Sequence, residues 1–160
     1  MTIKIGDNLP EGSFKIWNGD GMEVVTQSDY FANKKVAVFG LPGAFTPTCS
    51  AAHLPGYVVK SDELAAKGID AVACLSVNDA FVMGAWGREQ KATGKVRMMA
   101  DGSAVWTKAL GLELDLTARG MGVRSNRYAA YIVDGVVKVL HNEGPGKFEV
   151  SDAASMLKAI

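Results

Sequence analysis

The chain has 160 residues, of which 48% are hydrophobic, so it can form one domain with a full core but is too short for two ordinary domains. Lys plus Arg and Asp plus Glu number 17 each, so the net charge is zero and gives no electrostatic basis for binding nucleic acid. We therefore expect a single domain, residues 1–160, whose partners are small molecules or proteins.

Neither an export signal nor a membrane span is evident in the sequence. Residues 1–7 lack the apolar stretch of a signal peptide, and no later run approaches the roughly 18 apolar residues of a membrane span. We expect a cytoplasmic protein without membrane contact.

Cysteine and histidine are scarce. Cys49 and Cys74 lie 25 positions apart, which matches neither a secreted disulfide framework nor a zinc pattern. Only His53 and His141 could add imidazole ligands, so we expect no metal site and no cofactor. Reactive thiol chemistry in a reducing compartment fits these residues better.

The first predicted elements are a strand and a long helix. An apolar run at 36–41 is typical of a buried strand. A helix follows from about Pro47, bends near Pro55, whose ring would clash with the carbonyl of Ala51, and ends at Gly68.

A second strand and helix repeat this order. The apolar pattern of residues 69–77 predicts a buried strand. Asn78 or Asp79 then caps a predicted helix that carries Trp86 and ends near Gly94. The next elements are a strand at 96–99, a short helix at 103–110, a surface loop at 115–126, and strands at 128–133 and 136–140.

The end of the chain contains a hairpin and a helix. Asp134-Gly135 is a strong two-residue turn signal between the last two strands, and a final amphipathic helix begins at Ser151 or Asp152. Alternating strands and helices followed by an antiparallel hairpin and a helix predict an α/β protein. The expected fold is thioredoxin-like, with a mixed central sheet flanked by helices.

Cys49 stands at the entrance of the first long helix. Thr46 is a good N-cap and Pro47 suits the first helical position, so Cys49 falls three residues past the cap. Free amides and the positive end of the helix dipole favour a thiolate there, which makes Cys49 a candidate nucleophile.

Thr46 and Cys49 form a T-x-x-C pair where thioredoxin itself has C-x-x-C. A vicinal disulfide is impossible, so dithiol exchange in the manner of thioredoxin is excluded at this position. A hydroxyl on the same face of the helical turn can instead hold an oxygen substrate while the thiolate attacks it.

Pro42, Thr46 and Cys49 reproduce the P-x-x-x-T-x-x-C signature, and the chain resembles peroxiredoxins of the type II, or peroxiredoxin-five-like, branch. This resemblance implies a thiol peroxidase that reduces hydrogen peroxide and alkyl hydroperoxides through a sulfenic acid on Cys49. It also implies a homodimer. The likeness extends through residues 73–81, 101–103, 110–112 and 124–128.

The resemblance assigns catalytic roles to four residues. Cys49 is the peroxidatic residue, and Pro42 shields its thiolate from water. The Thr46 hydroxyl, the backbone N–H of Cys49 and one arginine donate hydrogen bonds to the peroxide. The S-x-R-aromatic motif makes that arginine Arg127, although Arg119 and Arg124 lie close by in the sequence.

Two further residues have weaker claims. His53 shares a helical face with Cys49, but a lone histidine is more often a hydrogen-bonded core or rim group than a proton shuttle. Cys74 is centred in an apolar strand, and we expect it to be structural. It could resolve Cys49 only if their Cα atoms were closer than about 7 Å or if the first turn of the helix unwound.

The route that regenerates the thiol follows from a missing cysteine. Some relatives carry a resolving cysteine near the C-terminal end, whereas residues 147–151 contain none here. We expect a one-Cys cycle completed by glutathione or glutaredoxin, with thioredoxin as the weaker alternative.

Other functions use the same cysteine. A peroxide sensor or redox-regulated chaperone also needs a reactive thiolate. The alternative of a general thiol-disulfide oxidoreductase is weakened because Thr46 replaces a cysteine.

The family likeness places dimer contacts near the active site. We expect these contacts to involve Phe45, Pro47, Phe81 and Gly84.

Overall fold

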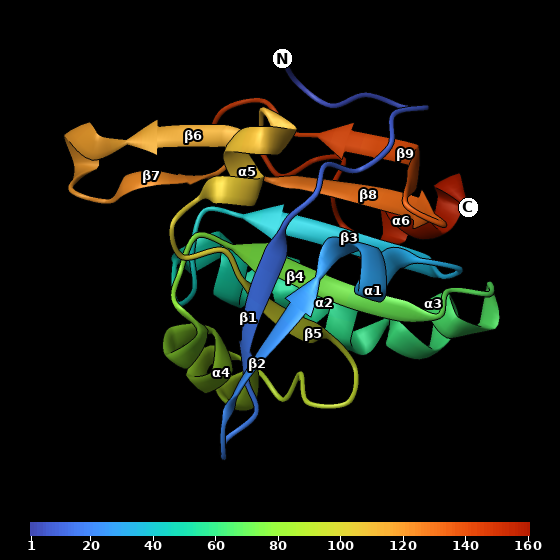
Figure 1. Ribbon diagram of the computed structural model, residues 1–160, viewed down its shortest axis with the longest axis horizontal. Helices are drawn as coiled ribbons and strands as arrows, with labels where there is room; N and C mark the ends of the chain where they lie inside the picture. The colour runs from blue at the N-terminus through green and yellow to red at the C-terminus, as the bar shows by residue number, and fades with distance from the viewer.

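A seven-stranded mixed sheet forms the centre of the structure, a computed structural model that describes residues 1–160 (Figure 1). Its strand order is β2-β1-β5-β4-β3-β8-β9; β3, β4 and β5 run parallel, and the other neighbours pair antiparallel. The predicted thioredoxin-like α/β fold is confirmed. The strands of this sheet are β1 Ser13–Trp17, β2 Met22–Thr26, β3 Lys35–Leu41, β4 Ala71–Ser76, β5 Arg97–Ala100, β8 Tyr128–Val133 and β9 Val136–Asn142.

Helices cover both faces of the sheet (Figure 1). One buried cluster contains residues of α2, α3, α4 and α6, and a second contains residues of α1 and α5, so the sheet lies between two apolar layers. No helix combines the length and the apolar character that crossing a membrane requires. The helices are α1 Gln27–Phe31, α2 Leu54–Val59, α3 Ser61–Ala66, α4 Ala80–Glu89, α5 Val105–Leu110 and α6 Ala153–Ala159.

The N-terminal hairpin was not among the predicted elements. Strands β1 and β2 pair along their whole length, from Ser13 opposite Thr26 to Trp17 opposite Met22. Only Phe14 and Ile16 are buried in them, so the apolar alternation is too short to stand out in the sequence. Docking against β5 supplies the partner that this hairpin needs.

The prediction of a surface loop at 115–126 was wrong. This segment contains most of a second hairpin, β6 Glu113–Leu116 and β7 Gly122–Ser125, which projects beyond the main sheet in Figure 1. A 3₁₀ turn at Thr117–Arg119 joins the strands, and Gly120 and Gly122 adopt the left-handed region at φ +73° and +67°. These glycines interrupt the apolar pattern because the turn requires them, while the flanking residues still pair.

The helix caps resolve two alternatives left open by the sequence. Asp79 caps α4 by accepting from the Val82 N–H, and Asp152 caps α6 by accepting from the Ser155 N–H. The side chain of Asn78 instead accepts from the Ala44 N–H at 2.9 Å, so it fixes the loop that follows β3.

A π-helical turn, Cys49–His53, precedes Pro55 where a bend was predicted. Pro55 has no N–H to donate to the Ala51 carbonyl. The Leu54 N–H donates to the carbonyl of Cys49, five residues back, so the backbone widens at this point. Such single π turns occur often at functional sites.

Gly40 allows β3 and β8 to approach each other around Tyr128. These two residues are paired across the strands, and a Cβ on Gly40 would lie 2.1 Å from Cε1 of the fully packed Tyr128 ring. Tyr128 directly follows Arg127, so this contact also fixes where the arginine leaves the sheet.

We predict that Gly40→Ala lowers the free energy of unfolding by about 1–3 kcal/mol or more, because the added methyl must displace a buried ring. Urea denaturation measures this change. Gly56→Ala is the matched control: its Cβ meets no atom within 4 Å in α2, so helix propensity makes it neutral or stabilising. Equal losses in the two variants would contradict the prediction.

Candidate active site

Cys49 lies directly beyond the carboxyl end of β3, in the first turns of a helix that begins at Pro47. Its side chain is fully buried in the cluster beneath α2 and α4. The position matches the helix entrance predicted from Thr46 and Pro47. What surrounds the sulfur therefore decides its chemistry.

The arginine beside the sulfur is Arg127. It precedes β8, which runs antiparallel to β3, so the start of β8 meets the end of β3. Its Nη2 donates to Cys49 Sγ at 3.3 Å. A guanidinium stays charged at all ordinary pH values, so this contact favours the thiolate over the thiol.

The other two arginines occupy different places. Arg124 donates from Nε to the Met121 carbonyl at 2.9 Å and from Nη1 to the Pro42 carbonyl at 3.4 Å, so it fastens the β6–β7 hairpin to the loop after β3. Arg119 lines the cavity in front of the site without contacting the sulfur. Pro42, the predicted shield, lines the same cavity.

The Thr46 side chain does not cap the helix as predicted. Its backbone carbonyl accepts from the Ser50 N–H, but its hydroxyl donates to the Gly43 carbonyl at 2.7 Å. That proton is therefore committed, and the oxygen lone pairs remain to accept a hydrogen bond. Thr46 also lines the cavity, so its oxygen can accept a hydrogen bond from the O–H of a hydroperoxide, whereas the sequence predicted that it donates one.

The backbone N–H of Cys49 has no acceptor among the hydrogen bonds of the structure. It is one of the unpaired donors at the start of a helix. Together with Arg127 it provides the two donors that a peroxide oxygen next to the sulfur needs.

His53, ranked as secondary from the sequence, lies at the centre of the site. Its Nδ1 accepts from Arg127 Nη1 at 2.9 Å and its Nε2 donates to the Ser151 carbonyl at 3.1 Å. An arginine can only donate, so Nδ1 carries no proton and Nε2 carries one. Burial first, and the neighbouring Arg127 cation second, lower the pKa of His53 to about 3, so the ring is neutral and cannot act as a proton shuttle near pH 7.

The segment 144–151 forms a wall of the site that the sequence did not indicate. Its Phe148 ring lies 5.6 Å from the Arg127 guanidinium carbon and 5.0 Å from the His53 ring. Tyr57 donates to the same Ser151 carbonyl as His53, at 2.8 Å. These residues carry no recognisable motif, because their roles depend on contacts across the fold.

Cys74 is enclosed in the sheet. It lies in β4 opposite Phe39 of β3 and is fully buried, and both cysteines are free thiols. Burial, and to a lesser degree the neighbouring Cys49, raise the pKa of Cys74 well above its usual value. The surroundings of Cys74 thus favour the protonated, unreactive thiol.

An open cavity of about 470 Å³ adjoins the site. Its cationic lining side chains are Arg119, Arg127 and Lys147, and no acidic residue lines it. The remaining walls are mostly apolar or backbone, including Leu114, Leu116 and Met121 of the β6–β7 hairpin and the turn at 144–146. The cavity can therefore admit an anionic or amphipathic molecule.

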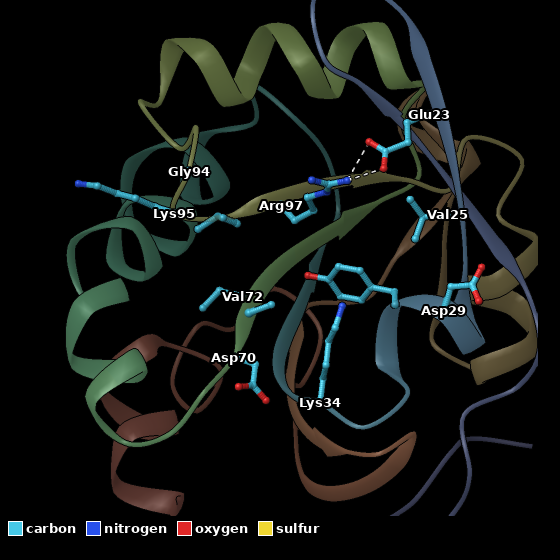
Figure 2. Close-up of a pocket in the computed structure, with 12 residues that line it drawn as sticks. Glu23, Val25, Asp29, Lys34, Asp70, Val72, Gly94, Lys95 and Arg97 are labelled. Atoms are coloured by element: carbon cyan, nitrogen blue, oxygen red, sulfur yellow. Dashed lines mark hydrogen bonds and ion pairs between the residues drawn. The ribbon is translucent and has the colours of Figure 1, made fainter.

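A cavity of similar size, about 500 Å³, lies at the opposite end of the sheet, where β4 and β5 begin. Figure 2 shows Arg97 paired with Glu23 there, with Lys34 and Asp70 among the other charged residues. It contains no cysteine or histidine. No cluster of three His, Cys, Asp or Glu side chains that could hold a metal ion occurs in the structure.

Sequence comparisons with known proteins identify the family of this chain. A sequence model of the Redoxin family matches residues 4–157. The chain is 50% identical over 165 residues to peroxiredoxin-2E-2, chloroplastic, of Oryza sativa subsp. japonica, with 99% of this chain and 73% of that protein covered. The chain belongs to the peroxiredoxin family.

Solved structures similar to this peroxiredoxin share its whole fold. Reduced Prx3 of Vibrio vulnificus in complex with H2O2 has a TM-score of 0.95 and 51% identity, with 99% of both chains covered. A Burkholderia cenocepacia protein described as a putative thioredoxin reductase has a TM-score of 0.98 and 57% identity, with 100% of this chain and 99% of that chain covered. As a peroxiredoxin, the protein is an enzyme, a thiol peroxidase.

The neutral state of His53 makes the stability of this peroxiredoxin depend on pH. Its pKa in the fold is lowered to about 3 from 6.5, so the unfolded chain binds the extra proton first and stability falls between pH 6.5 and pH 3. We predict that His53→Gln, which cannot titrate, loses about 2–3 kcal/mol less than the wild type between pH 7 and pH 4.5 in urea unfolding. His141→Gln is the control, and identical pH slopes in all three proteins would contradict the assignment.

Proposed function

We propose that this peroxiredoxin works by a one-Cys cycle of the type II kind, with Cys49 as its peroxidatic residue and glutathione or glutaredoxin as its reductant. The observation that carries the proposal is the hydrogen bond from Arg127 Nη2 to Cys49 Sγ. Cys74, the only other cysteine, is enclosed in β4. One sulfur is thus set up for attack and the other is not.

The peroxide step is a displacement at oxygen. The Cys49 thiolate attacks the terminal oxygen of a hydroperoxide, the S–O bond forms as the O–O bond breaks, and the sulfur becomes a sulfenic acid. The other oxygen leaves with the electron pair of the broken bond and takes a proton to become water or an alcohol. Arg127 and the Cys49 N–H stabilise the developing charge, and Thr46 accepts the hydrogen bond that orients the peroxide.

Hydrogen peroxide and alkyl hydroperoxides are the proposed substrates. The Vibrio vulnificus relative was crystallised with H2O2, which supports the smaller substrate. The apolar walls formed by Leu114, Leu116 and Met121 suit an alkyl group on the larger ones.

The reduction step uses an external thiol. Glutathione attacks the sulfenic sulfur, water leaves, and a mixed disulfide forms on Cys49; a second thiol then releases it. Glutathione carries two carboxylates, and Arg119 and Lys147 line a cavity that has no acidic residue. Complementary charge therefore supports glutathione over a neutral thiol.

A cytoplasmic homodimer is also proposed. Phe45 and Phe81 are each more than half exposed although both are large and apolar, which supports a contact surface at this side of the site. Phe45 lies beside Trp86, and Phe81 beside Trp17. Gly84 packs closely on Trp17, so its small size is needed within the chain itself.

The cycle is tested with cysteine variants. We predict that Cys74→Ala keeps turnover with peroxide, glutathione and glutaredoxin, while Cys49→Ser loses it, because only Cys49 contacts Arg127. A mass spectrum after one equivalent of peroxide and excess glutathione should show one glutathione on Cys49. A Cys49–Cys74 disulfide with loss of turnover in Cys74→Ala would refute the one-Cys cycle; oxidation without turnover would favour the alternative of a peroxide sensor or redox-regulated chaperone.

The cationic cavity is tested separately. We predict that Arg119→Gln and Lys147→Gln each raise the KM for glutathione about two- to fivefold, as expected for one exposed charge pair, without changing the rate of Cys49 oxidation by H2O2. Steady-state and single-turnover kinetics separate the two effects. Lys34→Gln removes the same charge from the cavity at the opposite end of the sheet and should change neither value (Figure 2). An unchanged KM in both cavity variants would remove this support for glutathione.

A further inference from the structure

Glu143, directly after β9, holds the following loop through one carboxylate oxygen. Its Oε2 accepts from the backbone N–H groups of Glu149, Val150 and Ser151 at 2.8, 2.9 and 2.9 Å, and from the Ser151 hydroxyl at 2.8 Å. The side chain is almost completely buried. A single buried oxygen thus closes residues 144–151 into a fixed loop.

Glu143 is ionised although no cation pairs with it. The two ion pairs of the structure, Lys60 with Glu63 and Arg97 with Glu23, lie elsewhere. Burial alone would raise the pKa of Glu143, but the hydrogen bonds from Val150, Ser151 and Glu149 outweigh it and lower the pKa below its usual value. Converging backbone N–H groups take the place of a counter-ion.

The loop presents one carbonyl to the active site. The carbonyl oxygen of Ser151, whose N–H and hydroxyl both bind Glu143, accepts from His53 Nε2 and from the Tyr57 hydroxyl. An acceptor at Nε2 requires the proton of the neutral ring to stay there. The Ser151 carbonyl therefore selects the tautomer of His53.

That tautomer orients the arginine. The bare Nδ1 of His53 accepts from Arg127 Nη1, and the same guanidinium then directs Nη2 at Cys49 Sγ. A proton on Nδ1 would face an N–H donor and remove this contact. Phe148, which belongs to the loop that Glu143 closes, packs against both His53 and the Arg127 guanidinium.

We propose that Glu143 is a positioning residue of the peroxidatic site: its carboxylate holds the Ser151 carbonyl, which sets the His53 tautomer and thereby aims Arg127 at Cys49. The effect passes from residue to residue through hydrogen bonds, and Glu143 itself does not touch the sulfur. The inference rests on Cys49 as the reacting group in the proposed function and is independent of the reductant.

The test is the Glu143→Gln variant, whose amide nitrogen cannot accept and whose neutral oxygen accepts less strongly from four donors. We predict that its Cys49 reacts with H2O2 about tenfold more slowly in single-turnover experiments, without any reductant. We also predict that the pH midpoint for alkylation of Cys49 by iodoacetamide rises, because Arg127 no longer holds the thiolate. A purely structural role would lower the melting temperature and leave that pH midpoint unchanged.

Glu149→Gln is the matched control. Glu149 is an exposed carboxylate in the same loop, so the variant makes the same change of charge without touching the Glu143 contacts, and both values should stay at the wild-type level. Should Glu143→Gln not fold, Ser151→Ala removes one of the four hydrogen bonds and should shift both values in the same direction by less.

A double-mutant cycle with His53→Gln tests the path. Glutamine has no tautomers, so Glu143→Gln should have little further effect in the His53→Gln background. An equal tenfold loss in both backgrounds, or a folded Glu143→Gln with wild-type rate and alkylation profile, overturns the proposal. A loss of turnover with glutathione alone would not contradict the role proposed for Glu143; it would count against glutathione as the reductant.

Discussion

A charged guanidinium next to a buried sulfur is the interaction on which the rest of the site depends. Arg127 cannot lose its proton, so each of its N–H groups that is removed from water needs an acceptor. Cys49 Sγ and His53 Nδ1 are the acceptors that the structure supplies. This requirement explains the preference for a thiolate. Burial keeps the imidazole neutral, and Arg127 adds to this effect because a protonated His53 would place two cations in contact.

The fold meets this requirement through strand pairing. Strands β3 and β8 run antiparallel, so the end of one and the start of the other meet at the same edge of the sheet. The absence of a side chain at Gly40 lets the Tyr128 ring pack against β3, and the preceding Arg127 then emerges beside the helix that carries Cys49. The loop closed by Glu143 covers the site from the other side and contributes Phe148 and the Ser151 carbonyl.

Local signals predicted the elements whose patterns are long or whose turns are chemically distinctive. The buried strands at 36–41 and 69–77 correspond to β3 and β4, and the Asp134-Gly135 turn joins β8 to β9, with both residues at positive φ. The β1–β2 hairpin was missed and the β6–β7 hairpin was taken for a loop. Their apolar alternation spans only four or five residues, and what stabilises each of them is pairing or docking that no local pattern reveals.

The sequence by itself determined the reactive residue: one cysteine three positions past a threonine at a helix entrance, with no second cysteine beside it, indicated single-thiol chemistry. It also singled out Arg127, but only through a short motif, with Arg119 and Arg124 close by. Only the tertiary structure decided which arginine reaches the sulfur, that the Thr46 hydroxyl donates to Gly43, and that His53 and Glu143 belong to the site. The physical reason is that these contacts join residues up to 98 positions apart in the chain, and their hydrogen-bond directions exist only once the sheet and loops are assembled.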